Sequence, residues 1–162
     1  MRKILFRGKR IDNGEWVEGQ TIVVIHQDDN DLLFMPQQGE DVKADPMDGN
    51  DRALTSIYGN YYQILPQTVG QYIGLTDKNG NEIFEGDILQ VKEHGGTGMK
   101  TCAIYFGEYI DADSDFEDYR CIGFYLKVFD ECFSIGVLLD SDFEFEIIGN
   151  IHDNPELLEV DT

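Results

Sequence analysis

Basic residues are scarce in this chain. Of its 162 residues, 12 are Lys or Arg and 32 are Asp or Glu, which gives a formal net charge of −20 at pH 7. A protein that follows nucleic-acid phosphates needs clustered positive charge, and an anionic membrane surface attracts the same kind of patch. The charge balance therefore argues against direct nucleic-acid binding and against attachment to such a membrane.

Long apolar runs and paired cysteines are also missing. The apolar run at the basic N-terminus covers only residues 4–6, too short for a signal peptide, and no window approaches the roughly 18 apolar residues of a membrane span. The three cysteines, Cys102, Cys121 and Cys132, have no CxxC spacing, which favours free thiols over a disulfide framework or a zinc site. We therefore expect a cytoplasmic protein.

Motifs that carry catalytic chemistry are absent as well. The sequence contains no Walker loop and no GxSxG, and His26, His94 and His152 are scattered without a metal-binding spacing. Carboxylate pairs such as Asp130 and Glu131 are expected by chance in so acidic a chain, and we interpret them as part of a solvated face. The sequence predicts no catalytic residue, no metal ligand and no cofactor.

Residues 77–82 resemble a calcium-binding loop at first, because oxygen-bearing side chains recur there at alternate positions. An EF-hand loop needs glycine at its sixth position and glutamate at its twelfth, whereas this chain has Glu82 and Ile88. The Asn79-Gly80 pair is instead typical of a tight β-turn. We predict a turn and no calcium site.

Short apolar segments that favour strands fill most of the chain. They are rich in Val, Ile, Phe and Tyr, and Gly, Asn and Asp separate them. The segments that we predict as extended span residues 4–9, 15–19, 21–26, 32–35, 54–65, 71–75, 82–84, 87–92, 100–106, 121–129, 133–139 and 143–148. The sequence therefore predicts an all-β protein.

Its organisation is predicted as two regions with Pro66 at the boundary. Residues 1–66 form a β-meander with a mobile acidic loop near residues 36–53, where the apolar pattern disappears. Residues 67–162 carry enough short strands for a small closed barrel or a sandwich. Asn154 followed by Pro155 and Glu156 predicts a short C-terminal helical turn.

Residues 140–148 alternate between acidic and apolar side chains. In a strand, Asp140, Asp142, Glu144 and Glu146 would share one face, and Phe143, Phe145 and Ile147 the other. The pattern predicts a wet anionic face opposite a core face, and it fixes the register against a one-residue slip.

Positive charge is concentrated at the N-terminus, where five of the twelve basic residues are Arg2, Lys3, Arg7, Lys9 and Arg10. A nucleic-acid arm is one interpretation, but a body of net charge −20 would repel a polyanion. We favour a basic first strand that lies against acidic strands of its own subunit or of a neighbour.

Three blocks of the sequence carry a family resemblance. They cover residues 6–9 with 14–19, residues 71–88 with an aromatic-x-Gly-Leu-x-Asp-x-Asn-Gly run leading to Glu-Gly-Asp, and residues 145–158. In these blocks the chain resembles the YopX family of phage and prophage proteins. The resemblance implies an all-β fold with a C-terminal SH3-like barrel at residues 67–162, a bacterial host, and no catalytic residue that can be carried over.

Two functional hypotheses follow. The first is a non-enzymatic accessory protein of a phage or prophage, a homo-oligomer that binds a host or phage protein. The alternative is an acidic decoy that imitates nucleic acid and inhibits a host nucleic-acid-binding protein. An enzyme ranks third, although Asp77, Glu85 and Asp87 in the middle block could form a polar site.

Overall fold

The computed structural model describes residues 3–27, 30–37, 61–93, 98–115, 119–140 and 142–159. Strands dominate these residues, and three short 3-10 helices accompany them. None of those helices has the length or the apolar character that a membrane crossing requires. The predicted all-β class is confirmed. The chain divides into two compact units, Met1–Gln71 and Tyr72–Thr162.

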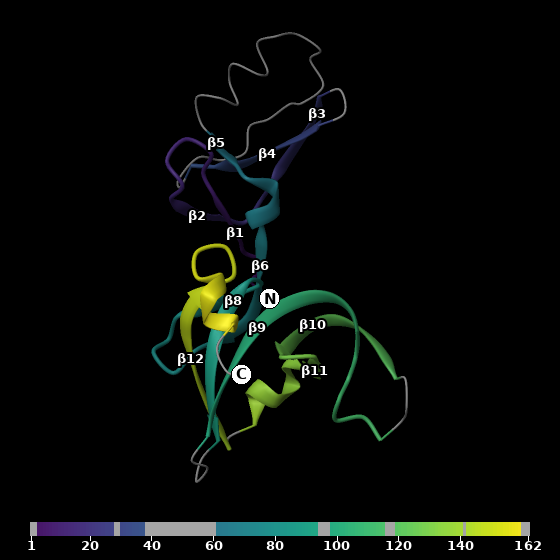
Figure 1. Cartoon of the computed structure of the whole chain (residues 1–162). Helices are drawn as coiled ribbons and strands as arrows, with labels where there is room; N and C mark the ends of the chain where they lie inside the picture. Colours follow the sequence, from purple (N-terminus) through teal and green to yellow (C-terminus); the bar gives the residue numbers. More distant parts are fainter. Residues whose placement is uncertain are drawn as a thin grey trace. The chain divides into compact units, whose positions relative to one another are not determined.

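The first unit contains a hairpin and a meander (Figure 1). The hairpin joins β1 (Phe6–Lys9) to β2 (Trp16–Gly19), and β1 also pairs with the first two residues of β6 (Gly70–Thr76). The meander consists of β3 (Val23–Gln27), β4 (Asn30–Pro36) and β5 (Tyr61–Ile64). Strands form at the predicted segments 4–9, 15–19, 21–26 and 32–35, whereas residues 38–53 of the predicted mobile loop lie outside the described residues.

Packing in this unit relies on a few large side chains. Leu5, Phe34, Met35 and Ile64 are buried. Pro66, the predicted boundary, begins the helix η1 (Pro66–Thr68). The Thr68 hydroxyl donates to the Leu65 carbonyl at 2.7 Å and accepts from the Lys9 amide at 2.9 Å, so that η1 is tied to β1.

A five-stranded antiparallel sheet forms the second unit, in the order β11-β10-β9-β8-β12. Its strands are β8 (Asp87–Glu93), β9 (Met99–Ile110), β10 (Arg120–Val128), β11 (Glu131–Ser134) and β12 (Phe143–Asn150). The rest of β6 pairs here with β7 (Glu82–Phe84). Figure 1 shows β9 and β10 as a long arched ribbon.

Gly107 faces Gly123 across β9 and β10, the two strands of the arch. Both glycines have φ near the edge of the left-handed region, +156° and +158°, which other residues rarely adopt. After the end of β9 the chain contacts β11, because Asp111 bridges to Cys132 and the Ala112 amide donates to the Cys132 carbonyl at 2.8 Å. The sheet is thus strongly curled; the SH3-like identity of this region stays a prediction.

The core of the second unit lies against one face of this sheet. Its buried members are Ile73, Ile83, Leu89, Cys102, Ile104, Leu126 and Leu138. Phe145 and Ile147 of β12 pack against them, as the alternation of residues 140–148 predicts. Ile88 and Leu89 are both fully buried, so β8 is covered on both faces.

One predicted strand is partly wrong. Residues 133–139 were expected to be extended, but β11 ends at Ser134 and the helix η2 (Ile135–Leu139) follows. The Ser134 hydroxyl accepts a hydrogen bond from the Gly136 amide and begins that helix. The predicted C-terminal helical turn is confirmed as η3 (Pro155–Leu158), which has proline at its start.

Candidate functional site

The turn between β6 and β7 is built around Asp77, which is only 5% exposed. Its Oδ1 accepts from the amides of Asn79 and Asn81, both at 2.9 Å, and its Oδ2 accepts from the Asn81 side chain and from the Ile147 amide. Burial raises the pKa of Asp77, but the hydrogen bonds from Asn81, Ile147 and Asn79 outweigh it and leave the pKa below its ordinary value. The predicted turn is confirmed, and its acid has a structural role.

Asp87 is the second buried acid of this region, with 1% exposure. It accepts from the Phe84 amide at 2.7 Å and from the Asn150 side chain at 3.5 Å. Asp77 and Asp87 thus each bind a residue of β12, Ile147 and Asn150 respectively. No group of side chains that could hold a metal ion occurs in the part of the chain that the structure describes.

The predicted row of four carboxylates on β12 is wrong. Asp140 caps the end of η2, and β12 begins only at Phe143, so Glu144 and Glu146 alone lie on the strand. Lys78 Nζ pairs with both, at 3.2 Å to Glu144 and 2.8 Å to Glu146. Hydrogen bonds from Lys78 and Asn79 lower the pKa of Glu146. This face is therefore partly neutralised.

The basic first strand lies mainly over aromatic rings. Arg7 and Lys9 stand over the Trp16 ring, with the guanidinium carbon and the ammonium nitrogen 4.8 and 5.4 Å from its centroid. Arg7 also lies opposite Glu18 in the register of β1 and β2, and the pairing of the basic strand with acidic strands stays a prediction. Arg10 lies 4.1 Å over Tyr62 and pairs with Asp12.

In the described ranges, the residues considered for catalysis do not form a group of His, Cys, Asp and Glu side chains. Burial raises the pKa of the Cys102 thiol to about 12, so this buried group is not a thiolate nucleophile at neutral pH. All three cysteines are free. Asp130 and Glu131 are exposed, and so is His152, while His94 lies outside the described residues.

The surface most suited to an interaction is one face of the arched ribbon. Cross-strand pairs place Phe106 opposite Phe124, and Ile122 opposite Glu108, on the same face as Ile110. Ile122 is 80% exposed, Phe106 56% and Ile110 49%. We name these four apolar residues, Phe106, Ile110, Ile122 and Phe124, the β9–β10 apolar face.

This face continues the one that covers the core. Ile104 and Leu126, the next pair toward the body of the sheet, are buried in the core cluster. Phe106 and Phe124 meet edge to face, with ring centroids 5.0 Å apart. The apolar side chains on this face thus continue from the covered core into the exposed part of the ribbon. In the described part of the chain, no element covers that outer part completely.

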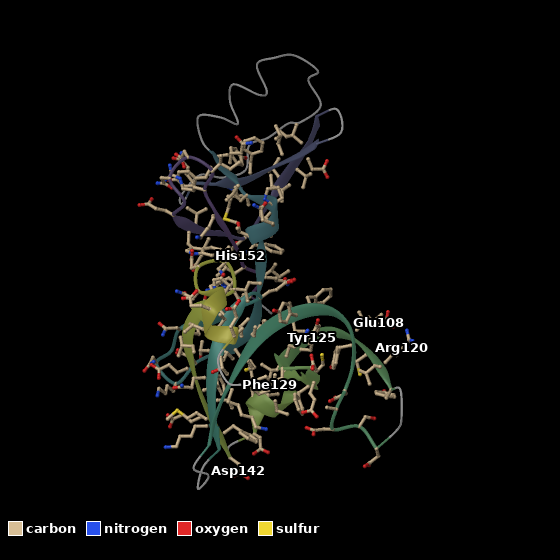
Figure 2. All side chains as sticks on the ribbon, viewed as in Figure 1. Glu108, Arg120, Tyr125, Phe129, Asp142 and His152 are labelled. Atoms are coloured by element: carbon tan, nitrogen blue, oxygen red, sulfur yellow. The ribbon has the colours of Figure 1, made fainter. Side chains whose placement is uncertain are left out.

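An ion pair lies on the same face. Arg120 Nη1 donates to Glu108 Oε1 at 2.8 Å, and both side chains are largely exposed. Figure 2 shows the two side by side at the far part of the arch. The face therefore combines exposed apolar groups with one positive and one negative charge.

With this geometry in place, comparisons with known proteins identify the family. The family profile described as YopX protein matches residues 5–159. The chain belongs to the YopX family. Among solved structures, this YopX-family chain is similar to the crystal structure of protein EF1440 from Enterococcus faecalis, with 24% identity, a TM-score of 0.46, and coverage of 96% of this chain and 97% of the other. No curated protein matches.

The three sequence blocks that carry the YopX resemblance correspond to three sets of consecutive elements. They fall on the β1–β2 hairpin, on β6 to β8 with the Asp77 turn, and on β12 with η3. The β9–β10 apolar face lies between the second and third blocks. Sequence reasoning missed it because aromatic residues occupy both faces of β9, so that Tyr105, Phe106, Tyr109 and Ile110 show no clean alternation.

Proposed function

We propose that this YopX-family chain is a non-enzymatic accessory protein of a phage or prophage that acts in the bacterial cytoplasm as a protein-binding module. We further propose that it self-associates through the β9–β10 apolar face. The observation that carries the proposal is the exposure of Ile122, Phe106 and Ile110 on one face of the ribbon. Contiguous exposed apolar groups are typical of protein interaction sites.

A second copy of the chain fits this face by its charge. Each copy offers one Arg120 and one Glu108, so a copy related by a two-fold axis can pair with them reciprocally. A net charge of −20 opposes association of identical chains. Burial of apolar side chains, about 1.5–3 kcal/mol for each one fully buried, is the contribution that can overcome this repulsion.

Light scattering coupled to size exclusion tests the proposal at low and high salt. We expect a dimer that persists at high salt, because apolar contacts are not screened. Ile122→Asp should weaken the dimer at least tenfold, which corresponds to about 1.4 kcal/mol. Leu139→Asp is the matched control, because Leu139 is 72% exposed on η2 and the variant makes the same change of charge. A monomeric wild-type chain, or equal effects of both variants, would contradict the proposal.

The acidic decoy stays the alternative prediction. The net charge of −20 supports it, but the regular acidic row that motivated it does not form on β12. Its test is a triple reversal of Asp142, Glu144 and Glu146 to Lys, combined with high salt. An interaction with a host nucleic-acid-binding protein that survives both changes excludes the decoy.

A further inference from the structure

A small pocket lies in the second unit on the other face of β9. It has a volume of about 260 Å³. The residues that line it are Met99, Lys100, Thr101, Ala103, Tyr105, Lys127, Phe129, Leu157 and Leu158. This volume lies just below the roughly 300 Å³ at which typical ligand pockets begin, so it suits a small ligand.

The first notable wall residue is Phe129. Val128 and Glu131 pair as the last residues of β10 and β11, so Phe129 and Asp130 form a two-residue hairpin turn. Phe129 has φ of 53°, the only positive φ outside glycine in the described part of the chain. Such turn positions favour Gly, Asn or Asp, because a bulky side chain there is strained.

Burial does not compensate for this strain, because the Phe129 side chain is 69% exposed (Figure 2). A large ring is therefore held at a costly position, exposed to solvent and at the pocket. Strained residues of this kind cluster at ligand-binding sites. Leu157 and Leu158 of η3 supply further apolar wall.

The second notable residue is Lys127. It lies opposite Ala103 in the register, on the face that carries Tyr105. In the described part of the chain neither Lys127 nor Lys100, the other lysine of the pocket wall, makes an ion pair, whereas Lys78 and Arg120 are both paired. A positive charge beside apolar walls is complementary to an apolar molecule with one anionic group.

We propose that this pocket binds a small apolar carboxylic acid. The body of the acid packs against Phe129, Leu157 and Tyr105, and its carboxylate pairs with the Lys127 ammonium. This site is independent of the β9–β10 apolar face, which lies on the opposite side of β9.

The test is an NMR titration of the full chain with 4-phenylbutyrate and with its neutral amide. We expect shifts that centre on the amides of Tyr105, Phe129 and Leu157, and binding of the acid about tenfold tighter than that of the amide, which corresponds to roughly 1.4 kcal/mol. Lys127→Gln should weaken binding of the acid but not of the amide, and the double variant Lys100→Gln with Lys127→Gln should reduce the affinity for the acid to that for the amide, because Lys100 also lines the pocket. Lys3→Gln, which removes the same charge from the first unit, should leave the tenfold preference in place.

Phe129→Asn gives a second and opposite readout. Asn tolerates the left-handed region, so the variant should unfold at a higher urea concentration than the wild type, yet bind both probes at least fivefold more weakly. Ile122→Asp should leave binding of both probes unchanged. Equal affinity for acid and amide, shifts centred elsewhere, or unchanged binding by Phe129→Asn would each overturn the proposal.

Discussion

Asp77 joins two distant parts of the chain with a single carboxylate. One oxygen closes the β6–β7 turn through two backbone amides, and the other reaches the Ile147 amide on β12. A buried carboxylate that accepts several amide hydrogen bonds stays ionised to low pH. The stability contributed by this group therefore depends on its charge as well as on its shape.

Replacement of Asp77 should show both contributions. Asp77→Ala leaves three backbone amides without their acceptor and should lower the free energy of unfolding by about 2–4 kcal/mol. Asp77→Asn keeps one acceptor oxygen and should lose less. Urea unfolding at neutral pH measures both values, and the exposed Asp113→Asn serves as a control that should change little.

The dependence on pH has a definite sign. The pKa of Asp77 in the folded chain lies below the ordinary 3.8, so the stabilisation is complete well above pH 3.8 and is lost as the pH falls through the folded pKa. The difference in stability between the wild type and Asp77→Asn should shrink between about pH 5 and about pH 3. A constant difference would contradict the assigned role.

For the residues around Asp77, the sequence predicted the turn but not the hydrogen bond to β12. Asn79 and Gly80 identified the turn, since turn chemistry is set by neighbouring residues. The bond from Asp77 to Ile147 spans 70 positions, and no short-range pattern encodes it. The same holds for Phe129, whose backbone angle depends on how β10 and β11 pair.

Among the elements, η3 and β12 are held together by close contact. A Cβ atom added at Gly149 would lie 2.8 Å from both Asn154 Oδ1 and Leu157 Cδ1. Real Cβ atoms do not approach other atoms so closely, so a side chain at this position must push aside the side chains of Asn154 and Leu157. The absence of a side chain at Gly149 lets the helix lie on the strand.

Gly149→Ala should therefore destabilise the second unit by about 1–3 kcal/mol, the usual cost of overpacking. Gly98→Ala is the control, because a Cβ at Gly98 meets nothing within 4 Å. Thermal unfolding followed by circular dichroism measures the two variants. Equal effects of the two would show that η3 shifts at little cost.

Strand positions were predicted well where one face is apolar and the other polar, as on β12 after Phe143. Prediction was poorer where this contrast disappears. Residues 135–139 are an apolar run without alternation, and the Ser134 cap decided in favour of a 3-10 helix. Asp140 and Asp142 do fit the alternation, but both lie before Phe143, where β12 begins.

For the whole molecule, the net charge of −20 sets the response to salt. Like charges repel over about 30 Å at 0.01 M salt but over only about 8 Å at 0.15 M. The exposed ion pairs of Lys78 and Arg120 contribute little that salt can remove. Salt should therefore weaken the repulsion between like charges more than it weakens the attraction within the ion pairs.

We expect the urea midpoint of unfolding to rise between about 0.01 M and about 0.15 M sodium chloride. Self-association through the β9–β10 apolar face should strengthen over the same range, because the approaching copies repel each other less. An acidic decoy bound to a basic partner would respond in the opposite direction. A midpoint that falls with salt would show that local ion pairs outweigh the net repulsion.

The hydrogen bonds from β12 to Asp77 and Asp87 also matter while the protein is being synthesised. A ribosome delivers the chain from its N-terminus, so both acids emerge long before Ile147 and Asn150, their partners on the last strand. Until then the edge of β8 has no neighbour on that side, and exposed edges of this kind recruit other chains. The nascent second unit is therefore most vulnerable to aggregation shortly before translation ends. A chain truncated before Phe143 should be degraded or should aggregate, and should not accumulate as folded protein.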